Sequence, residues 1–147
     1  MHEMLGNQYF MTRNYLGAAE VFANVLKEDP NNLNAKKKMI VSLTQIGKYE
    51  KAAQLFTELI SDNPDLIINT DPVKDDCPCY ELVDRLEEMT KLNDESFTTL
   101  QTLGILWLYC DINKSINYFR KAKGLKPSDK NINTVLNILE KKLQEIH

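Results

Sequence analysis

Hydrophobic residues along this chain recur every three or four positions, in segments separated by proline, glycine and short polar stretches. Such spacing is typical of amphipathic helices that bury one face. It predicts about eight helices, over residues 1–11, 15–28, 32–47, 48–61, 78–92, 95–109, 112–127 and 128–147. The pattern therefore predicts an all-α fold.

Several of these helix boundaries carry their own chemical signals. Pro30 and Pro64 cannot continue a helix and bias the preceding residue away from the helical region. Gly47 stands where a turn between helices needs a left-handed residue. The first turn has Arg13 at this place, and we expect Asn14 beside it to adopt the left-handed conformation instead.

Other boundaries have candidate caps. Asn32 is expected to cap the helix over 32–47, Asn93 or Asp94 the helix from 95, and Ser128 the last helix. Pro78 suits a first helical position.

Residues 5–64 carry one pattern twice. Four residues of the first copy recur 34 positions later: Tyr15, Ala18, Phe22 and Pro30 become Tyr49, Ala52, Phe56 and Pro64. The alanines let two helix backbones approach closely, and the aromatic rings fill the volume around them. In the first helix, Leu5 and Tyr9 are expected to face inward.

A third, less regular copy covers residues 96–127. Leu103, Gly104 and Trp107 correspond to Leu5, Gly6 and Tyr9, and Ser115 corresponds to Ala18. Gly104 and Ser115 are 11 residues apart, whereas Gly6 and Ala18 are 12 apart, so this hairpin is one residue shorter.

A 34-residue period with small residues at fixed points and a closing proline resembles the tetratricopeptide repeat (TPR) family. The resemblance implies a short α–α superhelix, a solenoid of helical hairpins. It implies a single domain over 1–147, with repeats at about 3–32 and 33–64, a degenerate third repeat at 96–127, an insertion at 65–95 and a capping helix at 128–147.

The segment 62–78 breaks the helical pattern, because it holds Pro64, Pro72, Pro78 and several aspartates. It is predicted to be a long loop, and loops of this length are often functional or mobile. Leu66, Ile67 and Ile68 are apolar enough to pack against the body of the domain.

In TPR proteins the first helix of each repeat lines a groove that binds peptide segments. By position, the resemblance implies a partner-binding groove formed by Asn7, Phe10, Met11, Lys37, Lys38, Val41, Thr44 and Gln45, continued in the third copy by Gln101, Ile105, Leu108 and Tyr109. Phe10 and Met11 would receive an apolar anchor, and Lys37 and Lys38 a carboxylate or phosphate. The alternative is that Lys36–Lys38 is only a solvated face and Phe10 only a core residue.

One subset of the family clamps the terminal carboxylate of chaperone tails with basic and asparagine side chains. Asn7 matches this pattern. Glu3 stands where a basic residue is needed, however, and Lys38 stands where the second asparagine is needed. The resemblance therefore does not extend to this clamp.

The net charge of −3 leaves no excess of lysine and arginine for nucleic acid. No long apolar run indicates a membrane span, and no signal peptide is recognisable, so a cytoplasmic protein is expected. Three cysteines are too few for a disulfide scaffold and suit a reducing compartment.

Cys77-Pro78-Cys79 gives an alternative function, because a thiol at a helix N-terminus favours metal binding or redox reaction. Asp75 and Asp76 oppose a thiolate there, and a zinc site usually needs four ligands. No catalytic constellation and no cofactor is predicted. The sequence therefore favours a non-enzymatic adaptor or scaffold for a protein partner. A metal- or redox-responsive protein is the alternative, and self-association stays open.

Overall fold

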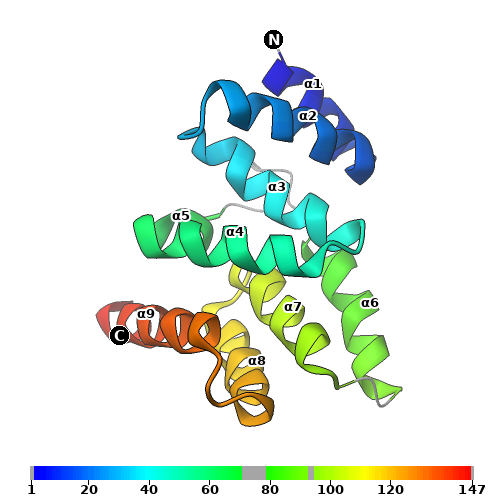
Figure 1. The fold of residues 1–147 in the computed structure, drawn as a ribbon. Coiled ribbons are helices and arrows are strands. Elements are labelled where there is room, and N and C mark those ends of the chain that lie inside the picture. Colours follow the sequence, from blue (N-terminus) through cyan, green and yellow to red (C-terminus); the bar gives the residue numbers. More distant parts are fainter. Residues whose placement is uncertain (1, 71–78, 93–94, 147) are drawn as a thin grey trace. The chain divides into compact units, whose positions relative to one another are not determined.

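A computed structural model of the protein describes residues 2–70, 79–92 and 95–146, which form nine α-helices and no strand (Figure 1). The helices are α1 (His2–Met11), α2 (Tyr15–Glu28), α3 (Leu33–Gln45), α4 (Tyr49–Asp62), α5 (Asp65–Ile68), α6 (Cys79–Lys91), α7 (Phe97–Leu108), α8 (Ile112–Leu125) and α9 (Lys130–Ile146). The predicted all-α fold is confirmed. One short helix, α5, was not predicted.

The chain divides into two compact units, Met1–Phe56 and Thr57–His147, and α4 crosses the boundary between them. Each unit has its own buried residues. The repeat boundaries and the single domain stay predictions.

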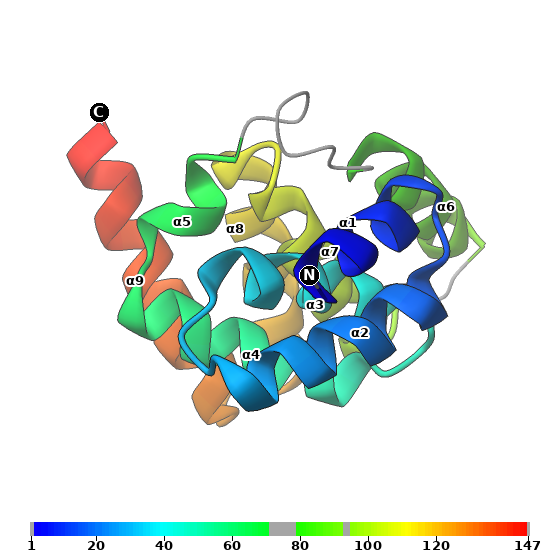
Figure 2. The same ribbon diagram turned by 90° about the horizontal axis from the view of Figure 1, so that it is seen from above.

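In the first unit, α2 packs against both α1 and α3, and α1 also contacts α3 (Figures 1 and 2). Ala18, Phe22 and Ile40 are fully buried. Gly6 lies directly against the ring of Phe22, so a larger residue would not fit at this position. Leu5 is 40% exposed, so the prediction that it faces inward is wrong: Gly6 and Phe10 are the buried residues of α1.

The turns after α1 and α3 are built alike. Gly47 has a φ of 82°, as predicted, and the Lys48 N–H donates to the Leu43 carbonyl at 2.9 Å. In the first turn Arg13 is the left-handed residue, with a φ of 63°. The prediction for Asn14 is therefore wrong, because its side chain instead accepts a hydrogen bond from the Gly17 N–H and caps α2.

In the second unit, α7 contacts α6 and α8, and α9 packs on α8. Nearly all of α7 is buried. Ile67 of α5 is 1% exposed, which confirms that this apolar segment is covered. The Lys142 ammonium of α9 lies 3.0 Å from the Asp65 carboxylate of α5, so an ion pair joins these two helices.

The predicted loop over 62–78 is partly helical, since α4 reaches Asp62 and α5 follows. Residues 71–78, with Pro72 and Pro78, lie outside the described residues, as do Asn93 and Asp94. Two cap predictions are corrected. Ser96 caps α7 by accepting from the Thr99 N–H, and Asp129, not Ser128, accepts from the Ile132 N–H at the start of α9. Asn32 caps α3 as predicted.

Candidate functional site

The contact between α1 and α3 brings polar side chains from both helices together. Glu3, Asn7 and Met11 are spaced by four residues on α1, and Asn34 and Lys38 by four on α3. Residues at this spacing share one side of a helix. We call these five residues the α1–α3 face.

Lys38 is held in place by two groups of α1. Its ammonium donates to the Asn7 side-chain oxygen at 3.0 Å and lies 5.5 Å from the centre of the Phe10 ring. A cation above an aromatic ring is attracted by the ring's negative face. The position of this positive charge is therefore set by α1 before any partner arrives.

Glu3 is the negative end of the same network. Its carboxylate accepts from the side-chain amides of Asn34 at 2.9 Å and Asn32 at 3.1 Å. The Asn34 amide also lies 3.5 Å from the Asn7 oxygen. The hydrogen bond from Asn34 has the larger effect and that from Asn32 the smaller, and together they lower the pKa of Glu3 below its usual value. The positive charge of Lys38 lowers this pKa further. One carboxylate and one ammonium thus stand on the face at neutral pH.

The predicted groove residues are buried to different degrees. Phe10 and Val41 are 1% exposed, Thr44 is 3% exposed and Lys37 is 8% exposed. The structure therefore places these four in the interior, as the core alternative expected for Phe10. Asn7, Lys38 and Gln45 are half-buried, and Met11 is exposed.

Three polar residues of α3 are buried, Lys37, Ser42 and Thr44, and the Thr44 hydroxyl has local partners. The Thr44 hydroxyl donates to the Val41 carbonyl at 2.6 Å and accepts from the Gln45 amide at 3.1 Å. In the third copy, Ile105, Leu108 and Tyr109 are buried within the second unit and Gln101 is half-buried. The side chains predicted to continue the groove in the third copy are therefore mostly buried.

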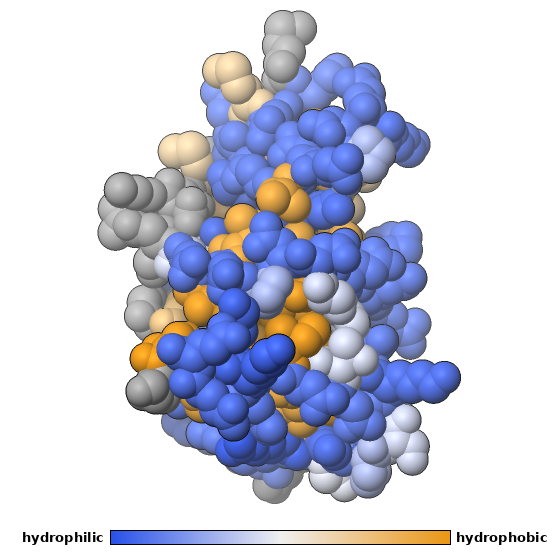
Figure 3. All heavy atoms as spheres, turned by 90° about the vertical axis from the view of Figure 1, so that its left-hand side faces the viewer, coloured by the Kyte–Doolittle hydropathy of each residue, from blue (hydrophilic) through white to orange (hydrophobic). Residues whose placement is uncertain are grey.

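The α1–α3 face has one exposed apolar side chain, Met11, and α1 exposes a second, Met4. Met4 and Met11, seven residues apart on α1, are 73% and 60% exposed. On the side of the molecule drawn in Figure 3, hydrophobic atoms occupy small areas between hydrophilic ones. A ligand on the α1–α3 face would contact its polar side chains and the exposed apolar side chain of Met11.

Sequence reasoning did not select Glu3 and Asn34 as site residues. Their signal was present, because Glu3 is four residues before Asn7 and Asn34 four before Lys38. The hydrogen bonds between the two helices depend on the register of α1 against α3, which a single sequence does not show.

Most of the segment Cys77-Pro78-Cys79 lies outside the described residues. Cys77 and Pro78 are outside the described residues, and α6 begins at Cys79. Cys110 is half-buried, and burial, with the nearby Asp111 charge, raises the pKa of its thiol to about 11. A thiol with that pKa is protonated and unreactive at neutral pH. Among the described residues, no group of three or more His, Cys, Asp or Glu side chains is placed to hold a metal ion.

None of the helices in the described part of the chain combines the length and the apolar character needed to cross a membrane.

Comparison with known proteins gives one family. A family model described as tetratricopeptide repeat matches residues 9–68. Solved structures similar to the chain include the first TPR domain of the human RPAP3 protein, at 12% identity and a TM-score of 0.43, covering 98% of this chain and 91% of that one. MamA from Desulfovibrio magneticus RS-1 is similar at 13% identity and a TM-score of 0.42, covering 97% and 84%. No curated protein matches the chain in sequence.

The matched segment runs from α1 through α5 and contains both copies of the 34-residue pattern. The α1–α2 hairpin, the left-handed turns at Arg13 and Gly47 and the buried alanines are the structural counterparts of that pattern. Residues 9–68 of this chain therefore belong to the tetratricopeptide repeat family.

Proposed function

We propose that the chain is a non-enzymatic protein-interaction module that binds a segment of a partner protein on the α1–α3 face. The observation that carries this proposal is the Lys38 ammonium, which Asn7 and the Phe10 ring hold in place. Met11, one helical turn after Asn7 on α1, has an exposed apolar side chain. A fixed charge next to an apolar side chain suits a partner segment with a carboxylate near an apolar residue.

Pre-organisation is what separates this lysine from an ordinary surface lysine. A free lysine loses side-chain freedom when it binds, at a cost of about 0.5–1.5 kcal/mol for a flexible side chain. The contacts of Lys38 with α1 meet part of that cost in the unbound protein. Glu3 lies on the same face, toward the N-terminus of α1, and repels a carboxylate of the partner segment there. The carboxylate is therefore favoured at Lys38, which sets the position of the segment.

Of the two lysines that the sequence offered, Lys38 is the one suited to a test. Lys37 is nearly buried, and a carboxylate at that position would destabilise the protein whatever the site does. Lys38→Glu reverses the charge at a half-buried position. Lys51→Glu, at an exposed position of α4, changes the net charge equally and serves as the matched control.

The experiment is selection of a random-peptide phage library on the full chain, followed by affinity measurement with the selected peptides. We expect peptides with an acidic and an apolar residue that bind about tenfold more weakly to Lys38→Glu and equally well to Lys51→Glu. Selected peptides that bind both variants as they bind the native chain would place the site elsewhere. Failure to select any peptide would count against a peptide-binding module.

A further inference from the structure

Helix α8 carries positive charge without negative charge. Between Ile112 and Ser128 the chain has no Asp or Glu, and it has five basic residues: Lys114, Arg120, Lys121, Lys123 and Lys126. Arg120 is paired with Glu140 of α9 at 3.2 Å. Within the described part of the chain, Lys114 and Lys121 form no ion pair.

Four residues of α8 form an uncovered row. Lys114, Tyr118, Lys121 and Leu125 follow at spacings of four, three and four residues, which places them on one side of the helix. Both lysines are exposed, Tyr118 is half-buried, and Leu125 is 54% exposed. We call these residues the α8 stripe.

Aromatic rings hold both lysines of the stripe. The Lys114 ammonium lies 4.1 Å from the centre of the Trp107 ring, and Trp107 is only 5% exposed. The Lys121 ammonium lies 5.3 Å from the centre of the Tyr118 ring. A cation over a ring loses some freedom yet keeps its outer side available to an anion.

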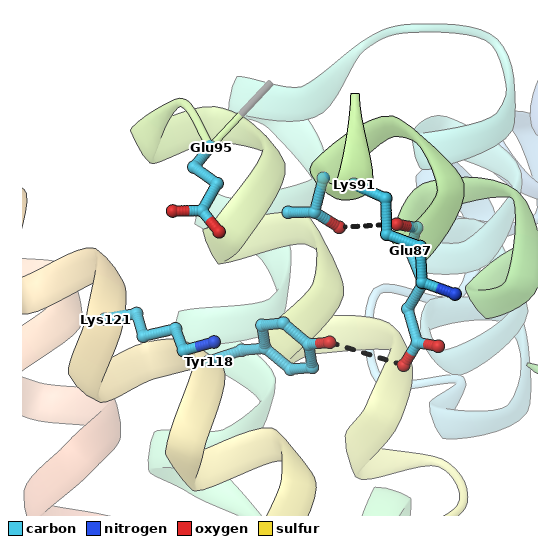
Figure 4. Close-up of a pocket in the computed structure, with 6 residues that line it drawn as sticks. Glu87, Lys91, Glu95, Tyr118 and Lys121 are labelled. Atoms are coloured by element: carbon cyan, nitrogen blue, oxygen red, sulfur yellow. Dashed lines mark hydrogen bonds between the residues drawn. The ribbon is translucent and has the colours of Figure 1, made fainter. Parts of the chain in front are cut away.

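Tyr118 is itself anchored. Its hydroxyl donates to the Glu87 carboxylate of α6 at 3.3 Å, and Figure 4 shows the ring between Lys121 and Glu87. Glu87 and Lys91 of α6 and Glu95, which precedes α7, line the same open pocket. Burial, the Glu87 and Glu95 charges and the hydrogen bond to Glu87 raise the pKa of Tyr118, so its hydroxyl stays protonated.

We propose that the α8 stripe binds a short acidic segment of a partner protein, with carboxylates at Lys114 and Lys121 and an apolar side chain on Leu125. Charge complementarity and the exposed leucine at one end of the row select this occupant. At about 1.5 Å per helical residue the stripe is about 17 Å long, which an extended segment of about five residues spans. The carboxylates of Glu87 and Glu95 line the pocket beside Tyr118 and Lys121, so they reduce the affinity of any anion at Lys121.

The stripe lies in the second unit and shares no residue with the α1–α3 face, so either proposal stands without the other. The probe is a fluorescein-labelled peptide of about five glutamates followed by a leucine, titrated into the full chain at low and at physiological ionic strength. Lys114→Gln/Lys121→Gln removes two positive charges from the stripe. Lys123→Gln/Lys130→Gln removes two from other exposed positions of the same unit and is the matched control.

We expect the stripe variant to bind the peptide about tenfold more weakly and the control variant to bind it like the native chain. Lys114→Arg/Lys121→Arg should keep the affinity, since arginine also stacks on aromatic rings. If the stripe and control variants lost affinity equally, binding would depend on net charge alone, and the proposal would be overturned. Absence of binding, or tighter binding of a labelled oligothymidylate than of the peptide, would overturn it as well.

Glu95→Gln gives a second readout with the opposite sign. Glu95 lines the pocket with Tyr118 and Lys121, so loss of its charge should strengthen binding of the acidic peptide about two- to threefold. Glu140→Gln removes the same charge at the ion pair with Arg120. If both substitutions change the affinity equally, the peptide does not lie along the stripe.

Discussion

The first and third helical hairpins, α1–α2 and α7–α8, share one contact and differ in their turns. In each, a glycine lies against a buried phenylalanine ring, Gly6 against Phe22 and Gly104 against Phe119. The first hairpin turns through left-handed Arg13, with the Asn14 N–H donating to the Tyr9 carbonyl at 2.8 Å. Of all described residues, only Arg13 and Gly47 have a positive φ, so the third hairpin turns without a left-handed residue.

The third hairpin closes its shorter turn with other hydrogen bonds. The N–H groups of Tyr109 and Cys110 donate to carbonyls three residues earlier, which tightens the end of α7. Asp111 caps α8, and the buried Ser115 hydroxyl donates to the Gly104 carbonyl. The two hairpins thus share the glycine–phenylalanine contact and differ in the geometry of the turn.

The largest expected effect comes from filling the shared contact. A methyl group at Gly104 would lie 2.9 Å from three Phe119 ring atoms, and one at Gly6 would lie 2.7 Å from the Phe22 ring. Gly104→Ala and Gly6→Ala should each lower the free energy of unfolding by about 1–2 kcal/mol, because overpacking outweighs the better helix propensity of alanine. Urea denaturation measures both.

Gly124→Ala in α8 is the matched control. A methyl group there has no neighbour within 4 Å. Its free energy of unfolding should stay unchanged or rise by up to about 1 kcal/mol. If Gly104→Ala were as stable as Gly124→Ala, the contact would not be the shared element of the hairpins.

The left-handed turns give an effect of intermediate size. Gly47→Ala should lower the free energy of unfolding by about 1 kcal/mol, because a side chain is strained at positive φ. Arg13→Gly should instead raise it by about 0.5 kcal/mol, since strain is relieved but the unfolded chain gains freedom. Thermal and urea unfolding of both variants measure this pair. Changes of the same sign would contradict the equivalence of the two turns.

The Ser115 hydroxyl tests how the shorter hairpin is closed. Ser115→Ala installs the residue that the first two copies have at this position and should cost about 1 kcal/mol, the usual worth of a buried hydrogen bond. Ser61→Ala removes a similar bond, from Ser61 to the Thr57 carbonyl at 2.7 Å, at an exposed position. Equal costs in urea denaturation would show that the Ser115–Gly104 bond has no special role.

The smallest effect concerns the polar network that only the first of the two hairpins has. Counting from Gly6 and Gly104, Glu3 and Asn7 correspond to Gln101 and Ile105, so the third hairpin lacks the charge. We expect an NMR titration to give Glu3 a pKa below its ordinary value, and Asn34→Ala to raise it. An unchanged pKa in Asn34→Ala would contradict the network.

The sign of the pH dependence follows from that shift. A carboxyl whose pKa is lower in the folded state adds stability above its unfolded-state pKa of about 4.3 and loses it as pH falls through the folded value. The stabilising effect of Glu3 should therefore be lost as pH falls below the unfolded-state pKa of about 4.3 and through the lower folded-state pKa, and it should be absent in Glu3→Gln.

The helices of this fold could be predicted well from the sequence. Their signals, namely the 34-residue period, the positions of the alanines and the prolines, depend on neighbouring residues in the chain. Gly47 as a left-handed turn residue and Asn32 as a cap are confirmed for the same reason. The left-handed conformation of Arg13 could not be predicted from the sequence. Arginine disfavours it, and the packing of α1 on α2 imposes it. The burial of Phe10 and Lys37 and the link between Glu3 and Asn34 depend on how helices face one another, which local patterns do not encode.

Binding of a partner segment to the α1–α3 face can be observed residue by residue. An amide-resolved NMR titration of the chain with a phage-selected peptide tests it most directly. The shifted signals should be those of Asn7, Met11 and Lys38. In Lys38→Glu the same peptide concentration should give smaller shifts, because the peptide binds about tenfold more weakly. Shifts confined to the outer surface of α2, or to the α8 stripe, would contradict it.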